Sequence, residues 1–177
     1  MALRKGSSYT KRYARPYTRK SKKKAKSYIK TVPNSKIVKF KMGDVKVFEK
    51  DSYPITIEVT SKEGAQIRDN SIEAVRQYLN RFLQSNVGKE FYLEVKIYPH
   101  HILRENKMLT GAGADRMQTG MSRSFGKSIG RAAIIKPNQI LFIIGVKTPK
   151  QESEARKLIN SVKSRLPCSI STQTKRK

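Results

Sequence analysis

The chain has 177 residues, which suits one domain of ordinary size with an appendage. It carries 39 Lys plus Arg against 13 Asp plus Glu, so the formal net charge is +26 at pH 7. A free protein would repel itself at that charge, and we therefore expect a polyanionic partner, with nucleic acid as the leading class. No apolar run approaches the roughly 20 residues of a membrane-spanning helix, and the first thirty residues lack the apolar core of a signal peptide.

Cysteine usage excludes two further classes of protein. Cys168 is the only cysteine, so no intrachain disulfide is possible and a structural zinc site with four ligands is nearly excluded. A single thiol fits a reducing, cytoplasmic setting. We expect no metal and no cofactor.

Residues 1–35 form a basic N-terminal extension. The first 36 residues contain 13 Lys plus Arg, and no acid precedes Asp44. Such a segment buries too little apolar surface to offset its ordering entropy, so it is either a solvated tail or a segment that orders on RNA. Interleaved tyrosines could stack on unpaired bases. The cations that we expect to bind RNA here are Arg4, Lys11, Arg12, Arg15, Arg19, Lys22, Lys23 and Lys24.

Residues 36–177 are expected to form a single α+β domain. Alternation of apolar residues predicts strands over 37–43, continuing through Val45 and Val47, and over 55–60. A helix follows, with an Asn70–Glu73 capping box at its start, an apolar stripe from Ile72 to Leu83, and Gly88 just beyond its end.

The second half of the domain is also predicted to contain strands and one helix. Residues 91–98 alternate strictly and predict a strand that Pro99 interrupts and Ile102–Leu103 resumes. Residues 132–135 and 139–146 read as two strands of a hairpin around a Pro137–Asn138 turn. Thr148, Pro149 and Gln151 begin a helix that runs to Leu166, and 168–171 predict a last edge strand. Two helices on a mixed or antiparallel sheet result.

A long segment without regular periodicity interrupts the domain. From Arg104 the apolar period disappears, and Gly111, Gly113, Gly120 and Gly126 alternate with cations. A segment of this length inside a compact domain is usually functional or disordered. Glycines let a backbone approach a phosphate chain, and Arg can grip phosphates or stack on bases. We therefore expect an arm that contacts RNA, with a solvated loop as the alternative.

Catalytic constellations are missing from the sequence. Residues 111–116 fail as a dinucleotide fingerprint, since Arg116 stands where the last glycine should be. His100 and His101 are adjacent and would point to opposite faces of a strand, so we expect one ring packed in the domain and one facing outward. We expect Glu105 and Asp115 to compensate the charge of neighbouring arginines and not to form an acid–base pair. An enzyme acting on RNA is the most distant hypothesis, and a free-standing RNA- or DNA-binding protein is a nearer alternative.

The residues of the arm carry a resemblance to a known family. Residues 98–109 (YPHHILRENKML), 113–121 (GADRMQTGM) and 125–127 (FGK) closely resemble the large-subunit ribosomal protein family L ten-e, whose bacterial form is L sixteen. Val32–Pro33, Lys36–Ile37 and Phe40 also fit, and the order of elements agrees through about residue 170. The chain lacks several cysteines of eukaryotic members, which favours an archaeal one.

This resemblance implies a fold and a role. The fold would include a hammerhead-like β element, and the protein would sit on large-subunit rRNA beside other large-subunit proteins, in the cytoplasm. It would help to position A-site tRNA, with a loop at 104–118 directed toward the peptidyl-transferase centre and the P-site tRNA. It would not be a catalyst, an obligate homo-oligomer or a membrane protein. Beyond the N-terminal extension, RNA contacts are expected from Arg104, Lys107, Arg116, Gln118, Arg123, Lys127 and Arg131, and the tRNA-proximal loop from Asn106, Met108, Gly111, Gly113 and Asp115.

Overall fold

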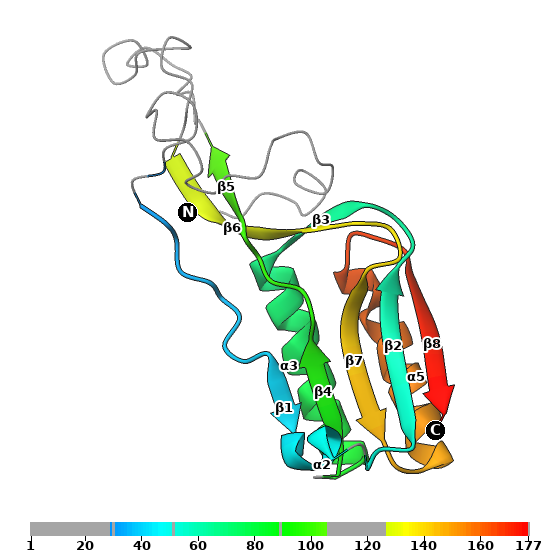
Figure 1. Ribbon diagram of the computed structural model, residues 1–177. Helices are drawn as coiled ribbons and strands as arrows, with labels where there is room; N and C mark the ends of the chain where they lie inside the picture. Colours follow the sequence, from blue (N-terminus) through cyan, green and yellow to red (C-terminus); the bar gives the residue numbers. More distant parts are fainter. Residues whose placement is uncertain (1–28, 30, 51, 89, 106–126, 177) are drawn as a thin grey trace, which may run out of the picture.

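A five-stranded antiparallel sheet forms the body of the protein in the computed structural model (Figure 1). The structure describes residues 29, 31–50, 52–88, 90–105 and 127–176. The strand order is β1-β4-β7-β2-β8, so β8 lies at an edge as the sequence predicts. The bounds are Lys41–Gly43 for β1, Tyr92–Val95 for β4, Ile140–Val146 for β7, Ile55–Ser61 for β2 and Ile170–Arg176 for β8.

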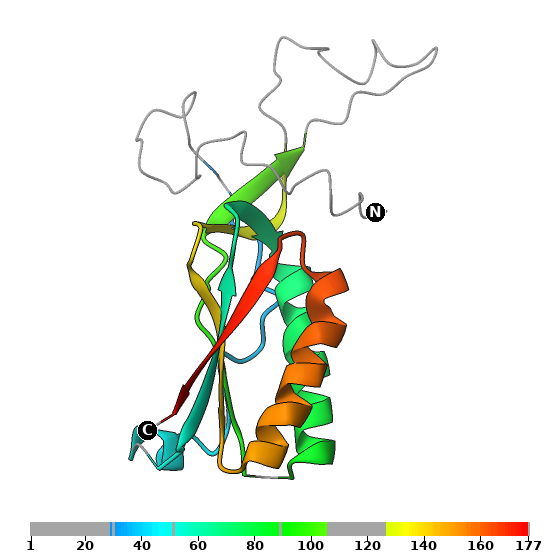
Figure 2. The same ribbon diagram turned by 90° about the vertical axis from the view of Figure 1, so that its right-hand side faces the viewer.

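Two long helices cover one face of this sheet. Figure 2 shows α3 (Asp69–Asn86, green) and α5 (Pro149–Val162, orange) as a layer to the right of the strands. Ile57, Ile144 and Leu93 are opposite one another across three strands and are fully buried. The apolar stripes predicted for both helices complete the core. The expected α+β fold with two helices on a sheet is therefore confirmed.

A second, three-stranded sheet lies at one end of the body. Its order is β3-β6-β5, and all its pairs are antiparallel. The strands are β3 (Ala65–Arg68), β6 (Lys127–Ile135) and β5 (His101–Glu105). This is the separate β element that the resemblance implied. In Figure 1, β5 and the start of β6 extend beyond the end of α3, away from the body.

Local signals explain several element ends. The capping box of α5 is formed, because Thr148 accepts from the Gln151 backbone and the Gln151 side chain accepts from the Thr148 backbone. Gly88 has φ +85° just after α3, the left-handed position that the sequence predicts. Gly43 has φ +81°, and a Cβ there would lie 2.0 Å from the Phe91 carbonyl oxygen, so only glycine fits.

Four local predictions were wrong. Val45 and Val47 lie in a short helix, α2 (Val45–Glu49), because the Asp44 side chain accepts from the Val47 N–H and starts a helical turn. The first long helix starts at Asp69 after Arg68, so the Asn70–Glu73 box does not form. The second long helix ends at Val162, before Leu166, and a single 3-10 turn, η2 (Lys163–Arg165), follows.

The fourth error concerns the hairpin. A turn at 137–138 joins β6 to β7, but these two strands do not pair with each other. Strand β6 pairs with β3 and β5, and strand β7 pairs with β2 and β4. The chain therefore changes sheet at this turn. Strand β3, which pairs with β6, was not predicted. Residues 104–105 belong to β5 and 127–131 to β6, so the chain between these two strands is 106–126. The rest of the predicted loop, 106–118, lies outside the described residues.

Candidate nucleic-acid interface

The ladder of β5 and β6 fixes both ends of the arm. Glu105 is opposite Lys127, and Arg104 is opposite Ser128, after a register irregularity between Leu103 and Arg104. The arm, residues 106–126, thus leaves and re-enters the domain at neighbouring strand ends. We call this end of the β5–β6 ladder the arm base. An antiparallel pair holds the two ends about 5 Å apart, which makes the arm base a rigid support.

Charge is distributed unevenly between the two sheets. In the body, carboxylates are paired with cations: Glu152 with Arg156 and Arg176, Glu58 with Lys175, and Glu73 with Arg76. The three-stranded sheet contains the cations Arg68, Arg104, Lys127 and Arg131, and Glu105 is its only acid. By formal charge, the four cations of the three-stranded sheet therefore outnumber its one acid.

A strap of extended chain, residues 31–40, ties the arm base to the body. At its start, the Ser128 hydroxyl donates to the Thr31 carbonyl at 2.9 Å, and Arg131 Nε donates to the Pro33 carbonyl at 2.6 Å. Both donors belong to β6. The strap begins with the last residues of the N-terminal extension, so the end of the extension lies against β6, the strand that directly follows the arm.

The far part of the strap is held by the body. The Lys36 N–H donates to Asp69 and the Val38 N–H to Glu73, both on the first turns of α3. Val95 of β4 donates to the Phe40 carbonyl at 2.8 Å, and Ile37 is buried in the core. Burial and these contacts together fix the path of the strap along the domain.

Aromatic rings gather where the strap meets the segment before β5. Phe40 stacks on Tyr98 with ring centroids 5.5 Å apart, and Tyr98 lies 4.4 Å from the His100 ring. The Tyr98 hydroxyl accepts from Arg131 at 3.1 Å, yet 42% of the residue is exposed. Tyr98 is not one of the site residues that the sequence predicts. Its place in an alternating strand indicated exposure, but its contact with Arg131 depends on a long-range pairing that the sequence does not reveal.

Three of the predicted site residues lie on the β5–β6 ladder, Arg104 and Lys127 at the arm base and Arg131 farther along β6. Lys127 is exposed, while Arg104 and Arg131 are half-buried. Arg131 is committed to Pro33 and Tyr98, so it organises the interface from within. The remaining predicted residues, from Arg4 to Lys24 in the extension and from Asn106 to Arg123 in the arm, lie outside the described residues.

The histidine prediction is confirmed. His101 is 3% exposed and His100 is exposed, so the two rings cannot act on one atom. In the described part of the chain, no cluster of three or more His, Cys, Asp or Glu side chains could hold a metal ion. None of its helices has the length and apolar character needed to cross a membrane.

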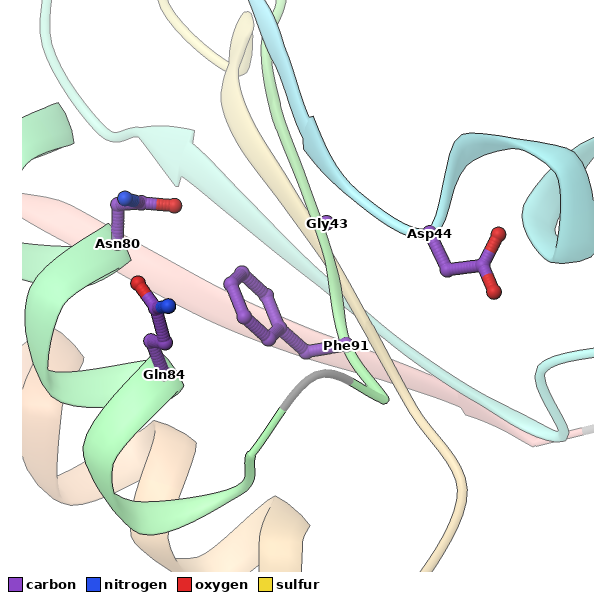
Figure 3. Close-up of a pocket in the computed structure, with 5 residues that line it drawn as sticks. All are labelled: Gly43, Asp44, Asn80, Gln84 and Phe91. Carbon is purple, nitrogen blue, oxygen red and sulfur yellow. The ribbon is translucent and has the colours of Figure 1, made fainter.

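A groove of about 450 Å³ opens at the other end of the body (Figure 3). It is lined by Gly43, Asp44, Asn80, Gln84 and Phe91. Among the described residues that line it, Asp44 has the one ionisable side chain, and one of its oxygens accepts from the Val47 N–H. The groove therefore offers no acid–base pair, and it gives no support to the enzyme hypothesis.

The chain combines a folded α+β domain with two strongly basic segments. This combination is typical of nucleic-acid-binding proteins. Comparison with known proteins makes the class specific. The model of the family described as ribosomal protein L16p/L10e matches residues 15–173. The chain therefore belongs to the L16p/L10e family of ribosomal proteins, as its arm residues predicted.

Archaeal proteins resemble the chain over almost its whole length. The large ribosomal subunit protein uL16 of Staphylothermus marinus is 42% identical over 168 residues, covering 94% of this chain and 90% of that protein. The uL16 of Methanococcus maripaludis is 38% identical, covering 94% and 91%. The uL16 of Caldivirga maquilingensis is also 38% identical, covering 100% of this chain and 97% of that protein.

Proposed function

We propose that the chain is a structural component of the large ribosomal subunit in the cytoplasm, where it binds rRNA and lies among other large-subunit proteins. The observation that carries this proposal is the shared origin of its two basic segments. Contacts from Ser128 and Arg131 bring the end of the N-terminal extension to β6, the strand on which the arm also ends. Two cationic segments that are joined to the domain at the same strand suit a folded RNA with many phosphates.

The finer role concerns tRNA. By its likeness to the family, the arm is directed toward the peptidyl-transferase centre and helps to position A-site tRNA, close to the P-site tRNA. Arg104 and Lys127 would bind phosphates at the arm base, and Arg116, Gln118 and Arg123 would contact rRNA farther along. The protein positions RNA and does not itself catalyse a reaction.

A crosslinking experiment in assembled subunits tests this proposal. A photoreactive side chain at Lys127 should crosslink to rRNA in purified large subunits. The matched control is the same side chain at Gln173, an exposed position on β8 in the body. Crosslinks from Lys127 to proteins alone would contradict the proposal.

A salt gradient distinguishes the alternative of a free-standing nucleic-acid-binding protein. A component held by shape and by many contacts should stay with the large subunit at salt concentrations that remove loosely bound basic proteins. If the chain sediments mainly free of the subunit even at low salt, the ribosomal proposal fails and the alternative is favoured.

A further inference from the structure

The outer face of α3 is unusual for a solvent-exposed helix. Its two acids, Asp69 and Glu73, lie in the first turns and are 3% and 7% exposed. The exposed positions that follow are Gln77, Arg81, Gln84, Ser85 and Asn86. An exposed helix face usually mixes both signs of charge, whereas this one carries a cation and amides with no exposed carboxylate.

Two arginines stand over aromatic rings on this side of the helix layer. The Arg165 guanidinium of η2 lies 4.6 Å from the Tyr78 ring centroid, and the Arg81 guanidinium lies 5.9 Å from that of Phe82. The two rings are 4.4 Å apart. The four side chains thus form one continuous cluster, which we call the α3 cluster. Both arginines are exposed.

Neither arginine of the α3 cluster makes an ion pair within the part of the chain that the structure describes. The contrast with the rest of the helix layer is clear, because Arg156 is paired with Glu152 at 3.0 Å and Lys157 with Glu154 at 2.9 Å. A guanidinium that lies against a ring keeps N–H donors at its edge for an outside acceptor. The cluster therefore holds two pre-positioned cations, and no carboxylate among the described residues forms an ion pair with either of them.

We infer that the α3 cluster is a second RNA-binding surface, separate from the arm base, and that it takes the phosphate backbone of a folded RNA. This inference rests on the proposed function. Charge favours a polyanion, and the neighbouring groups favour RNA. Gln77 and Ser85 lie four residues before and after Arg81 and are exposed. Their amide and hydroxyl groups can both donate and accept, which suits ribose hydroxyls and base edges. An acidic protein partner would gain little from them.

Position makes the two surfaces independent. Figure 2 shows the helix layer on one side of the sheet, while β5 and β6 extend from one end of the body. The protein would then hold RNA along its side as well as at the arm base. A protein held at one contact can still rotate about that contact. Two contacts on the same rigid domain prevent this rotation and would therefore fix the direction of the arm.

The salt dependence of RNA binding tests the inference. The full chain is titrated with rRNA extracted from large subunits over a range of KCl concentrations. The slope of log K against log salt is negative, and each lost phosphate contact makes it less steep by about 0.7 to 0.9. The double variant R81Q/R165Q should therefore lose about 1.5 in slope, whereas R81K/R165K should keep most of it because the charge is retained.

A charge-matched control shows whether a change in slope comes from the α3 cluster itself or only from the lower net charge of the variant. K157Q/K175Q also removes two exposed cations, but each is already paired, with Glu154 at 2.9 Å and Glu58 at 2.7 Å. This control should change the slope by much less than R81Q/R165Q. Equal changes in the two double variants, or an unchanged slope in R81Q/R165Q with a preserved thermal unfolding transition, would overturn the inference.

Crosslinking in the assembled subunit separates this inference from the proposed function. A photoreactive side chain at Ser85, on the same outer face, should crosslink to rRNA. If Lys127 crosslinks to RNA and Ser85 only to protein, the proposed function stands and the α3 cluster is a protein-binding surface, so the inference fails. If neither position reaches RNA, both fail.

Discussion

The substitution Glu73→Gln is expected to destabilise the domain strongly. Glu73 is 7% exposed and accepts from Arg76 at 2.7 Å and 2.6 Å, from Gln77 at 3.0 Å, and from the Val38 N–H of the strap at 3.4 Å. Removing one partner of a buried ion pair costs about 3–5 kcal/mol, because the other charge stays buried without compensation. Glutamine keeps one acceptor oxygen, so we expect about 3 kcal/mol, a large share of a typical total of about 5–15 kcal/mol.

Urea unfolding of the full chain measures this loss. With a denaturant dependence of about 2 kcal/mol per M, the midpoint should fall by about 1.5 M. The double variant E73L/R76M removes both charges together and should recover most of the loss, since apolar replacements of a buried pair are often neutral. A midpoint shift below about 0.5 M for E73Q, or a double variant as unstable as the sum of its single changes, would refute the reasoning.

The pH dependence of the same variant gives an independent check. Hydrogen bonds from Arg76 hold the pKa of Glu73 below its ordinary value of 4.5, against the opposing effect of burial. A carboxyl with a lowered pKa stabilises the folded state above its unfolded pKa, and this contribution is lost as the pH falls through the folded value. The difference in midpoint between the natural chain and E73Q should therefore narrow below pH 4.5, whereas a constant difference would contradict an ionised Glu73.

Three smaller perturbations test local features of the frame. Gly43→Ala should lower the thermal midpoint clearly more than Gly88→Ala, because both glycines have positive φ but only Gly43 meets a carbonyl oxygen, at 2.0 Å; similar shifts would contradict the close approach. Thr148→Ala should cost about 1 kcal/mol in urea unfolding through loss of the helix cap, with the exposed Ser153→Ala as a near-neutral control. Burial raises the pKa of the Cys168 thiol, so alkylation at neutral pH should be slow in the folded chain and fast in urea; equal rates would refute this.

Local patterns predicted local structure well. The alternation over 55–60 gave a strand, and the Thr148–Gln151 box gave a helix start, because both depend on neighbours a few residues away. The short helix at Val45–Glu49 was missed since apolar residues two apart fit a strand as well as one helical turn. Its cap, Asp44, was the signal that could have decided the question.

The pairing of strands that are far apart in the chain could not be predicted from the sequence. Strands β6 and β7 look like a hairpin because a turn joins them, yet each finds other partners. The strap is the clearest case: its contacts with Arg131 and Ser128 join residues almost one hundred positions apart. Arg131 was predicted as an RNA contact from the family resemblance, and only the fold shows that it holds the strap.

The strap's attachment can be tested through Arg131→Met. The variant loses the bond from Nε to the Pro33 carbonyl, at 2.6 Å, and the bond to the Tyr98 hydroxyl, at 3.1 Å, while methionine keeps apolar bulk. Hydrogen bonds from a charged donor contribute about 1.5–3 kcal/mol, and partial exposure places this pair at the lower end. Local opening of the strap should then become about tenfold more frequent, since 1.4 kcal/mol is a factor of ten.

Amide hydrogen exchange measures that opening directly. The amide of Lys36, which donates to Asp69, should exchange about tenfold faster in Arg131→Met, while the amides of β2 in the body keep their protection. Arg156→Met is the matched control, because it removes an arginine that bonds Glu152 and Thr174 far from the strap. If Lys36 exchanges equally in both variants, Arg131 does not hold the strap. It would then be available for RNA, as the family resemblance implies, and its bond to Pro33 would not fix the strap against β6.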